Sequence, residues 1–448
     1  MRLLHTADWH LGQTLHGFDR SVEHQAFLDW LLDVLTNEDI DVLLLAGDIF
    51  DTANPPSAAQ HQFYRFVAAA QARQPGLAIV AIAGNHDSAG RLEAPLPLLE
   101  LCRVNVVGQT RRLPDGAVDL ERLLVPLHDR SGALRAWCLA VPFLRPGDVP
   151  RVTDAPAAAP AAADVSAAED RATHEPAAGH ARDPYLDGVV RLYRDTLTLA
   201  CARRAPDQAI IALGHCHLSR GQISEASERP LVIGGAEALD AALFDDRLAY
   251  VALGHLHRPQ VLGTHPVIRY SGSPLPMSFS EREYPHQVVV VELDGAALAA
   301  SDPVRSIRVP RRVDLLRIPP QPRPLDEVLA ALAAWSGGDP ALPDTEWPYL
   351  SVAVLLDGPE PTLRQQVEHV LAGKAVRLAR IDVQPRVRAG DNAPTDALSL
   401  DALAQLDPRA VYTAAYRNRF AAEPPPETLA ALTQLMNASD DASAGDRR

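Results

Sequence analysis

The stretch VLLLAGDIFD, residues 42–51, decides the fold of this 448-residue chain. Four apolar residues are followed directly by Ala46, Gly47 and Asp48. A short apolar run of this kind is typical of a buried strand in a parallel sheet. The stretch therefore predicts a rigid strand that presents a carboxylate at its carboxyl end.

Four other motifs also follow predicted strands, and all of them carry polar side chains. They are DWH at 8–10, GNHD at 84–87, GH at 214–215 and GHLH at 254–257. Between the first three strands, residues 23–35 and 58–70 have the apolar spacing of helices. This alternation predicts an α/β fold with parallel strands joined by right-handed crossovers. The motifs should then meet at the carboxyl ends of the strands, where open α/β sheets place their sites.

Together the motifs supply the ligands that two adjacent divalent ions require, namely two aspartates, an asparagine and several histidines. One carboxylate can bridge both ions, and two ions about 3.5–4 Å apart are a common device for cleaving phosphate esters. In an extended segment, residues i and i+2 point the same way, so Asp8 and His10 can reach one ion. His255 and His257 have the same spacing. The chain is therefore predicted to be a two-metal phosphodiesterase.

Individual residues of two motifs have distinct expected roles. Asp48, at the mouth of a buried strand, is placed to bridge the ions; the alternative is a cap of the next helix, a role that Asp51 fits better. The amide oxygen of Asn85 is a neutral ligand. His86 can instead face the substrate and donate a proton or hydrogen bond to the phosphate or the leaving oxygen. Asp87 could orient the His86 imidazole.

Other histidines and cysteines are weaker candidates. His215 supplies one more ligand, whereas His217 is a less certain alternative because only one ligand is still missing. Cys216 lies between them, and we expect a bystander rather than a zinc thiolate. The four cysteines include no CxxC pair, which is typical of reduced thiols in a cytosolic protein. The remaining histidines expected to be packing or surface residues include His5, His24, His61 and His265.

The chain also divides into segments. Residues 135–293 are rich in strands, but the interruption at about 152–181 is rich in Ala, Pro and Asp and is predicted to be disordered. The proline-rich run at 319–322 predicts a second boundary. Beyond it come helices at 325–335 and 363–371, strands at 350–356 and 376–383, and two amphipathic helices at 408–420 and 427–436.

Charge and composition limit the function classes. The net charge of −15 argues against a broad basic surface for nucleic acid. Lys374, the only lysine, follows Gly373 but precedes Ala375, so the chain lacks the Gly-Lys-Ser/Thr of a phosphate-binding loop. If ATP is involved, another subunit must bind it. No apolar run approaches the ~18 residues of a membrane span, and no signal-peptide layout is present.

The order of the motifs, D-x-H, GD, GNH, H and GHxH, resembles that of the calcineurin-like metallophosphoesterases. Longer stretches look like the bacterial SbcD nuclease subunits, counterparts of the nuclease in double-strand-break repair complexes. These stretches are LHTADWHLG at 4–12, LLLAGDIFD at 43–51, IAGNHDS at 82–88, LGHLHRPQ at 253–260 and YSGSPLPMSFSE at 270–281. The resemblance implies a two-sheet sandwich flanked by helices, a small α+β capping domain and a C-terminal helical pair.

Carried over by motif, the resemblance implies two metal sites. The first would be held by Asp8, His10, Asp48 and His257, and the second by Asp48, Asn85, His215 and His255. His86 would be the catalytic histidine. The nitrogen and oxygen ligands, together with what the resemblance implies, favour manganese over magnesium, which prefers oxygen. Some relatives have a histidine where Asp51 stands, so we expect no catalytic role for Asp51.

The segment pattern and the family resemblance together predict the domain boundaries. We expect a nuclease domain over 1–310 with the insertion at about 152–181, a capping domain over 311–388, an ATPase-binding helical segment over 397–437 and a disordered tail over 438–448.

The expected function is a Mn²⁺-dependent DNA exonuclease and endonuclease that acts on DNA ends and hairpins in repair and recombination. Its implied partners are DNA, an SbcC-like SMC-type ATPase and a second copy of the chain, in the cytoplasm at the nucleoid and without a membrane. The main alternative is a stand-alone metallophosphatase or cyclic-nucleotide phosphodiesterase, which has no need of the residues beyond about 310. A non-enzymatic scaffold is disfavoured because it would have no reason to keep seven ligands.

Overall fold

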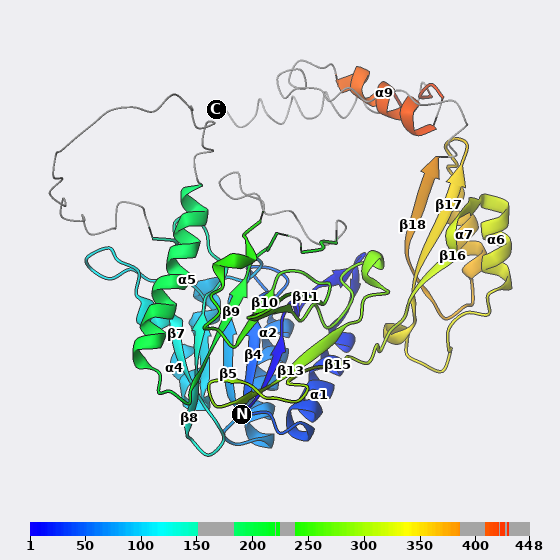
Figure 1. The fold of residues 1–448 in the computed structure, drawn as a ribbon. Coiled ribbons are helices and arrows are strands. Elements are labelled where there is room, and N and C mark those ends of the chain that lie inside the picture. Colours follow the sequence, from blue (N-terminus) through cyan, green and yellow to red (C-terminus); the bar gives the residue numbers. More distant parts are fainter. Residues whose placement is uncertain are drawn as a thin grey trace, which may run out of the picture. The chain divides into compact units, whose positions relative to one another are not determined.

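The computed structural model describes residues 1–150, 183–219, 221–224, 238–385, 408–420, 422–425 and 428–429. The chain divides into two compact units, Met1–Arg312 and Val313–Arg448. Figure 1 shows the elements of both, and each unit is described by itself. The predicted insertion at 152–181, the helix at 427–436 (except residues 428–429) and the tail at 438–448 lie outside the described residues.

The first sheet of the larger unit has strand order β14-β13-β1-β4-β5-β6, with β15 paired to β13. Strands β1, β4, β5 and β6 are parallel, and β13 runs antiparallel to β1. The strands are β1 (Arg2–Thr6), β4 (Val42–Ala46), β5 (Ala78–Ile82), β6 (Val104–Val107), β13 (Gln287–Asp294), β14 (Ala297–Leu298) and β15 (Val304–Arg308). The crossovers are made by α1 (Ser21–Asn37) and α2 (Ser57–Arg73).

The second sheet has strand order β11-β12-β10-β9-β8-β7, and β8, β9, β10 and β12 are parallel to one another. Its strands are β7 (Leu124–His128), β8 (Leu134–Ala140), β9 (Ala209–His215), β10 (Tyr250–Gly254), β11 (Gln260–Thr264) and β12 (Val267–Tyr270). Helix α5 (Pro184–Arg203) covers one face of this sheet (Figure 1). Shorter elements are β2 (Thr14–Leu15), β3 (Phe18–Asp19), α3 (Ala89–Glu93) and α4 (Leu96–Leu99).

Strand periodicity sorts the apolar side chains of the first sheet into two cores. Leu44 packs in one cluster with residues of the second sheet and of α5, whereas its neighbours Leu43 and Leu45 pack with α1 and α2. Each fully buried Leu contributes about 1.5–3 kcal/mol of transfer free energy. Two sheets thus enclose one core, and helices cover their outer faces. The predicted two-sheet α/β sandwich is confirmed.

The smaller unit is a three-stranded parallel sheet in the order β16-β17-β18, with α6 and α7 packed on it. Its elements are β16 (Leu315–Pro324), α6 (Leu325–Ala334), β17 (Tyr349–Leu356), α7 (Leu363–Leu371), β18 (Arg377–Pro385) and α9 (Pro408–Phe420), which contacts β18. The boundary predicted at the proline run 319–322 is wrong. The run lies inside β16, an edge strand whose register shifts between Ile318 and Arg323, where missing N–H groups are tolerated.

Among the described residues, no helix is both long and apolar enough to cross a membrane.

Candidate metal centre

The five motifs converge where the carboxyl ends of β1, β4, β5, β9 and β10 meet. Backbone hydrogen bonds join the first two loops, since Asp8 N–H donates to Gly47 O at 3.0 Å and His10 N–H donates to Asp48 O at 3.0 Å. The loop from the second sheet is joined to them by His255 N–H, which donates to Asp8 Oδ1 at 2.9 Å. The convergence expected from the strand pattern is therefore present.

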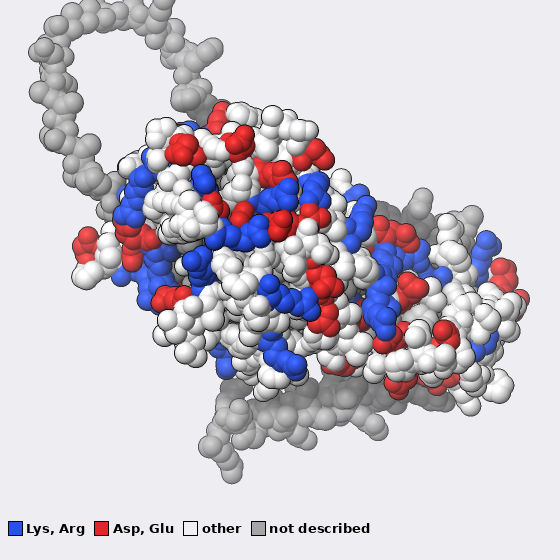
Figure 2. All heavy atoms as spheres, turned by 90° about the horizontal axis from the view of Figure 1, so that it is seen from below, with Lys and Arg blue, Asp and Glu red and all other residues white. Residues whose placement is uncertain are grey.

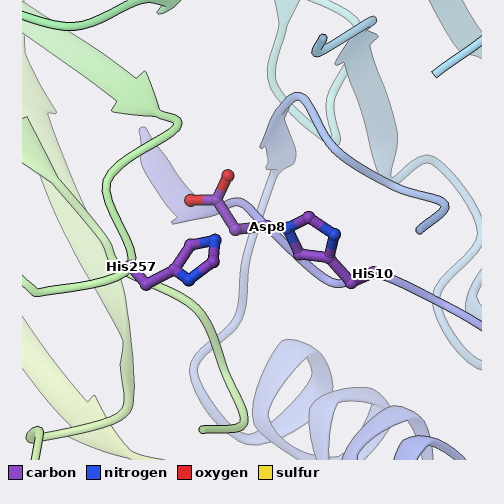
Figure 3. A group of neighbouring side chains, drawn as sticks. All are labelled: Asp8, His10 and His257. Atoms are coloured by element: carbon purple, nitrogen blue, oxygen red, sulfur yellow. The ribbon is translucent and has the colours of Figure 1, made fainter. Parts of the chain in front are cut away.

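One group of side chains comprises Asp8, His10 and His257, whose ligand atoms lie within 4.8 Å of one another. Figure 3 shows the Asp8 carboxylate and the two imidazoles side by side, on the loops after β1 and β10. Asp8 Oδ2 and His10 Nε2 are buried and have no hydrogen-bond partner among the described residues. Buried polar atoms without a partner are costly, and a bound cation would satisfy both. This donor set fits a divalent metal ion.

A second group comprises Asp48, His215 and His255, again with ligand atoms within 4.8 Å of one another. Asn85 belongs with them, because its Oδ1 lies 2.9 Å from His215 Nε2 and 3.1 Å from His255 Nδ1. Two imidazole nitrogens, a carboxylate and an amide oxygen thus face one another. The set fits a second divalent ion.

Asp48 lies between the two groups. Its Oδ2 is 3.3 Å from His215 Nε2 and 3.7 Å from His10 Nε2. Burial alone would lower the pKa of His215, but the carboxylates of Asp48 and Asp8 raise it to about 9. His215 in turn holds the pKa of Asp48 below its usual range, against the effect of burial. Positive charge is therefore stabilised beside Asp48.

The loops are held in an uncommon backbone conformation. Asp8, His10, Asp48 and His255 have φ values of 55°, 45°, 49° and 103°. Positive φ outside glycine costs roughly 1–3 kcal/mol per residue and persists only where the surroundings enforce it. Close packing contributes, since a Cβ on Gly84 would lie 2.1 Å from Asp48 Oδ1. The GNHD motif therefore needs its glycine so that the Asp48 carboxylate can approach.

In three of the candidate ligand histidines, Nδ1 faces an oxygen that lies outside the candidate ligand set. Nδ1 of His215 donates to Ala46 O at 2.8 Å, and Nδ1 of His257 donates to Glu281 Oε1 at 2.9 Å. Nδ1 of His10 lies 3.3 Å from Asp51 Oδ1. With a proton on Nδ1, the lone pair on Nε2 is available for a metal, and the outer partner fixes the ring.

The His86 ring is held by a different partner from the one expected, Asp87. Its Nδ1 donates to the backbone carbonyl of Asp51 at 2.7 Å, and its N–H donates to Asp48 Oδ1 at 2.9 Å. Asp87 does not orient the ring: its carboxylate accepts from the N–H groups of Ile49, Phe50 and Gly84 and so joins two ligand loops. Burial, with the charge of Asp48, raises the pKa of Asp87 to about 6.

The cap predicted at Asp51 is also wrong. Helix α2 is preceded by Pro56 at the N-cap, and Asp51 lies within the site, beside both His10 and His86. His86 also forms a third group with His10 and Asp48, so it lies within reach of the metal ligands.

Sequence reasoning misses two residues of the site. It gives Asp51 no role there, and it includes Glu281 only as the end of a matching stretch. Glu281 is fully buried and lies 24 positions beyond the histidine that it contacts. No spacing rule connects the pair, so the sequence offers no signal for this contact.

The residues expected to lie outside the site do so. His5 is buried against Tyr250 and His24 within the helical layer, whereas His61 and His265 are exposed. Cys216 is in no ligand group of the described residues, and burial raises the pKa of its thiol to about 12.

Comparison with known proteins bears on both units. The family model of the calcineurin-like phosphoesterases matches residues 1–259, and the model described as the type 5 capsule protein repressor C-terminal domain matches residues 311–420. The curated SbcD subunit of the nuclease SbcCD from Rhodobacter capsulatus is 39% identical over 421 residues, covering 93% of this chain and 94% of the relative. That of Bacillus subtilis is 38% identical, covering 65% and 66%, and that of Escherichia coli K12 is 35% identical, covering 63% and 62%.

These matches agree with the geometry of the site. The phosphoesterase model covers all five motifs, and the Rhodobacter relative and the second family model extend the likeness through the smaller unit. The chain belongs to the SbcD family of nuclease subunits, within the calcineurin-like phosphoesterases.

Proposed function

We propose that the chain is a two-metal DNA nuclease in which Asp48 bridges the ions. The first ion is held by Asp8, His10, Asp48 and His257, and the second by Asp48, Asn85, His215 and His255. The observation that carries the proposal is the position of Asp48 Oδ2, 3.3 Å and 3.7 Å from ligand nitrogens of the two groups. A single carboxylate shared by two ligand sets is the arrangement that a bimetallic phosphodiesterase requires.

The ions are proposed to be Mn²⁺. Four imidazoles and three oxygen-bearing side chains make up the donor set, and Mg²⁺ prefers oxygen ligands and retained waters. Two divalent ions, when bound, supply a water nucleophile and neutralise the charge that develops on the phosphate. The protein contributes rigid loops that fix the ligands before the substrate arrives.

His86 is proposed to act on the substrate. Its Nδ1 proton is held by the carbonyl of Asp51, so Nε2 is left to face the phosphate or the leaving oxygen. When the ring is protonated, Nε2 can donate a hydrogen bond to the phosphate or a proton to the leaving oxygen. The partner is the backbone carbonyl of Asp51 and not its carboxylate, so the orientation of the His86 ring does not depend on the charge of the Asp51 side chain.

DNA and an SbcC-like ATPase are the proposed partners. The relatives are named subunits of the nuclease SbcCD, and this chain has no phosphate-binding loop of its own. Figure 2 shows arginines interspersed with acidic residues on the face seen from below, in keeping with the net charge of −15. A surface of mixed charge attracts duplex DNA weakly, which supports the proposal that much of the affinity for the duplex comes from the partner.

Helix α9 is the proposed ATPase-binding element. Tyr412, Tyr416 and Phe420 stack along it, with ring centroids 5.9 Å and 4.8 Å apart. An aromatic stripe on a short helix is a common anchor for a partner, and here Tyr412 and Phe420 are partly exposed while Tyr416 is buried. A homodimer in the cytoplasm, at the nucleoid, completes the proposal.

The test is hydrolysis by the purified protein, supplied with Mn²⁺ or Mg²⁺, of linear duplex DNA and of bis-p-nitrophenyl phosphate. The proposal expects Mn²⁺-dependent cleavage of both, and ATP-dependent duplex degradation when the ATPase is added. Hydrolysis of phosphomonoesters or cyclic nucleotides without any cleavage of DNA would instead support the stand-alone phosphatase.

A further inference from the structure

Glu281 lies on the 3-10 turn Phe279–Glu281, between the two loops that supply the first group of ligands. Its side chain is completely buried. One carboxylate oxygen accepts from His257 Nδ1 at 2.9 Å, and the other accepts from the backbone N–H of Met277 at 2.7 Å. Both oxygens are therefore engaged, which is the condition under which a buried carboxylate is tolerated.

The turn that carries Glu281 is tied to His257 by the backbone as well. Ser273 N–H donates to His257 O at 3.1 Å. His286 then bridges the loop, since its ring nitrogens lie 2.9 Å from Ser273 O and 3.1 Å from Glu281 O. The carboxylate is consequently presented to His257 from a fixed position, not from a flexible side chain at the surface.

The same turn is tied to the loop after β1, which carries Asp8 and His10. Arg20 Nη1 donates to Pro276 O at 2.7 Å, and Gln13 Nε2 donates to Met277 O at 3.2 Å. Arg20 is itself buried and paired with Glu23 at 2.9 Å. The turn thus joins the two loops whose ligands make up the first metal group.

We infer that Glu281 is a positioning residue for the first metal ion, acting through His257. An ionised carboxylate can only accept, so its contact keeps the proton on Nδ1 of His257 and leaves the Nε2 lone pair to face Asp8 and His10. It also prevents rotation of the ring, and it raises the basicity of the imidazole as a ligand. His215 of the second group is held by a neutral carbonyl instead, so the effect is confined to one of the two sites.

The inference rests on the proposed function, because it takes His257 to be a ligand. Its test is Mn²⁺ binding to the full-length protein by equilibrium dialysis, for the wild type, Glu281→Gln, His257→Gln and the double variant. Glu281→Gln should lower the affinity for one of the two Mn²⁺ ions by about 10–100-fold and leave the affinity for the other unchanged. Because Glu281 acts through His257, the double variant should bind no more weakly than His257→Gln alone.

Glu93→Gln is the matched control. Glu93 is also a buried carboxylate that accepts from a backbone N–H, that of Gly108 at 2.9 Å; its other partners are Arg111 and Arg122, and none of the three is a candidate ligand. The Glu93→Gln variant should bind both Mn²⁺ ions with unchanged affinity. If Glu281→Gln does not fold by circular dichroism, Glu281→Asp, which keeps the charge and shortens the reach, takes its place with the same expectation.

The outcomes separate the two claims. Retention of both ions by His257→Gln would overturn the metal assignment and the inference with it. Loss of one ion in His257→Gln, with unchanged Mn²⁺ affinity in Glu281→Gln, would overturn the inference alone. Additive losses in the double variant would also overturn it, because they would show that Glu281 supports the site by a route other than His257.

Discussion

Replacing Asp48 by asparagine should remove both metal ions together. The change keeps the size of the side chain but removes the negative charge from Oδ2, which lies 3.3 Å and 3.7 Å from ligand nitrogens of the two groups. Two unit charges 4 Å apart interact by about 4 kcal/mol at an effective dielectric constant of 20. An ion bound by the carboxylate is closer and doubly charged, which strengthens the attraction, and its dehydration offsets part of that gain, so about 4 kcal/mol sets the scale for each ion. A loss of about 4 kcal/mol corresponds to roughly a thousandfold in affinity.

The assay is elemental analysis of the protein after dialysis against Mn²⁺, together with cleavage of linear duplex DNA. Asp48→Asn should bind neither ion at concentrations that saturate the wild type, and cleavage should be abolished. Asp41→Asn is the control, since Asp41 precedes the same strand β4 at its other end and accepts from Arg2 N–H at 2.8 Å. Two bound manganese ions and normal turnover in Asp48→Asn would refute the assignment of a bridging carboxylate.

Four further predictions address the rest of the chain. His86→Ala should keep both ions but lower DNA cleavage by about 10²–10⁴-fold, the usual size of general acid catalysis; a collapse of metal occupancy in dialysis would mean that His86 is a ligand. Truncation after Asp396 should spare Mn²⁺-dependent hydrolysis of small phosphodiesters and abolish co-purification with the ATPase, and full-affinity binding by the truncated protein would count against an anchor in α9. Deletion of residues 155–178 should leave melting temperature and activity nearly unchanged, because the segment lacks core-forming residues. His24 is buried, which lowers its pKa from 6.5 to about 3. The unfolded chain therefore binds an extra proton between these values, and the free energy of unfolding should fall as pH drops through that window, by up to about 1.4 kcal/mol per pH unit. His24→Leu should flatten this dependence in urea unfolding, and an unchanged slope would contradict it.

The elements that carry the site could be predicted because their patterns are local. The helix expected at 23–35 is Ser21–Asn37, and the strand expected at 42–45 is Val42–Ala46. The convergence of the motifs could also be predicted, because the carboxyl ends of parallel strands meet at one edge of a sheet. The proline run at 319–322 misled the prediction, since an edge strand tolerates residues that break a central one.

The partners of the ligands could not be predicted, because they depend on the tertiary fold. Asp87 follows His86 directly, and that adjacency suggested a contact between them. In the structure, Asp87 instead satisfies the N–H groups of the neighbouring loop, at Ile49 and Phe50. The carbonyl of Asp51 and the carboxylate of Glu281 take the orienting roles. A backbone carbonyl has no sequence signature, and a glutamate 24 positions away from its histidine has none until the fold is known.

The division of ligands between the sheets has a thermodynamic consequence. Asp8, His10, Asp48 and Asn85 come from loops of the first sheet, whereas His215, His255 and His257 come from the second. Neither sheet alone presents a complete set, so an ion bound at either group requires the sandwich to be packed. Four of these residues also sit at positive φ, which raises the free energy of the loops that the packing must hold. Ligands that bind only the folded state stabilise it by mass action, by about 2.7 kcal/mol at a hundred times the dissociation constant. Ions bound at the proposed site would therefore offset part of the strain of these loops, and the rigidity of the site is coupled to the contact between the two sheets.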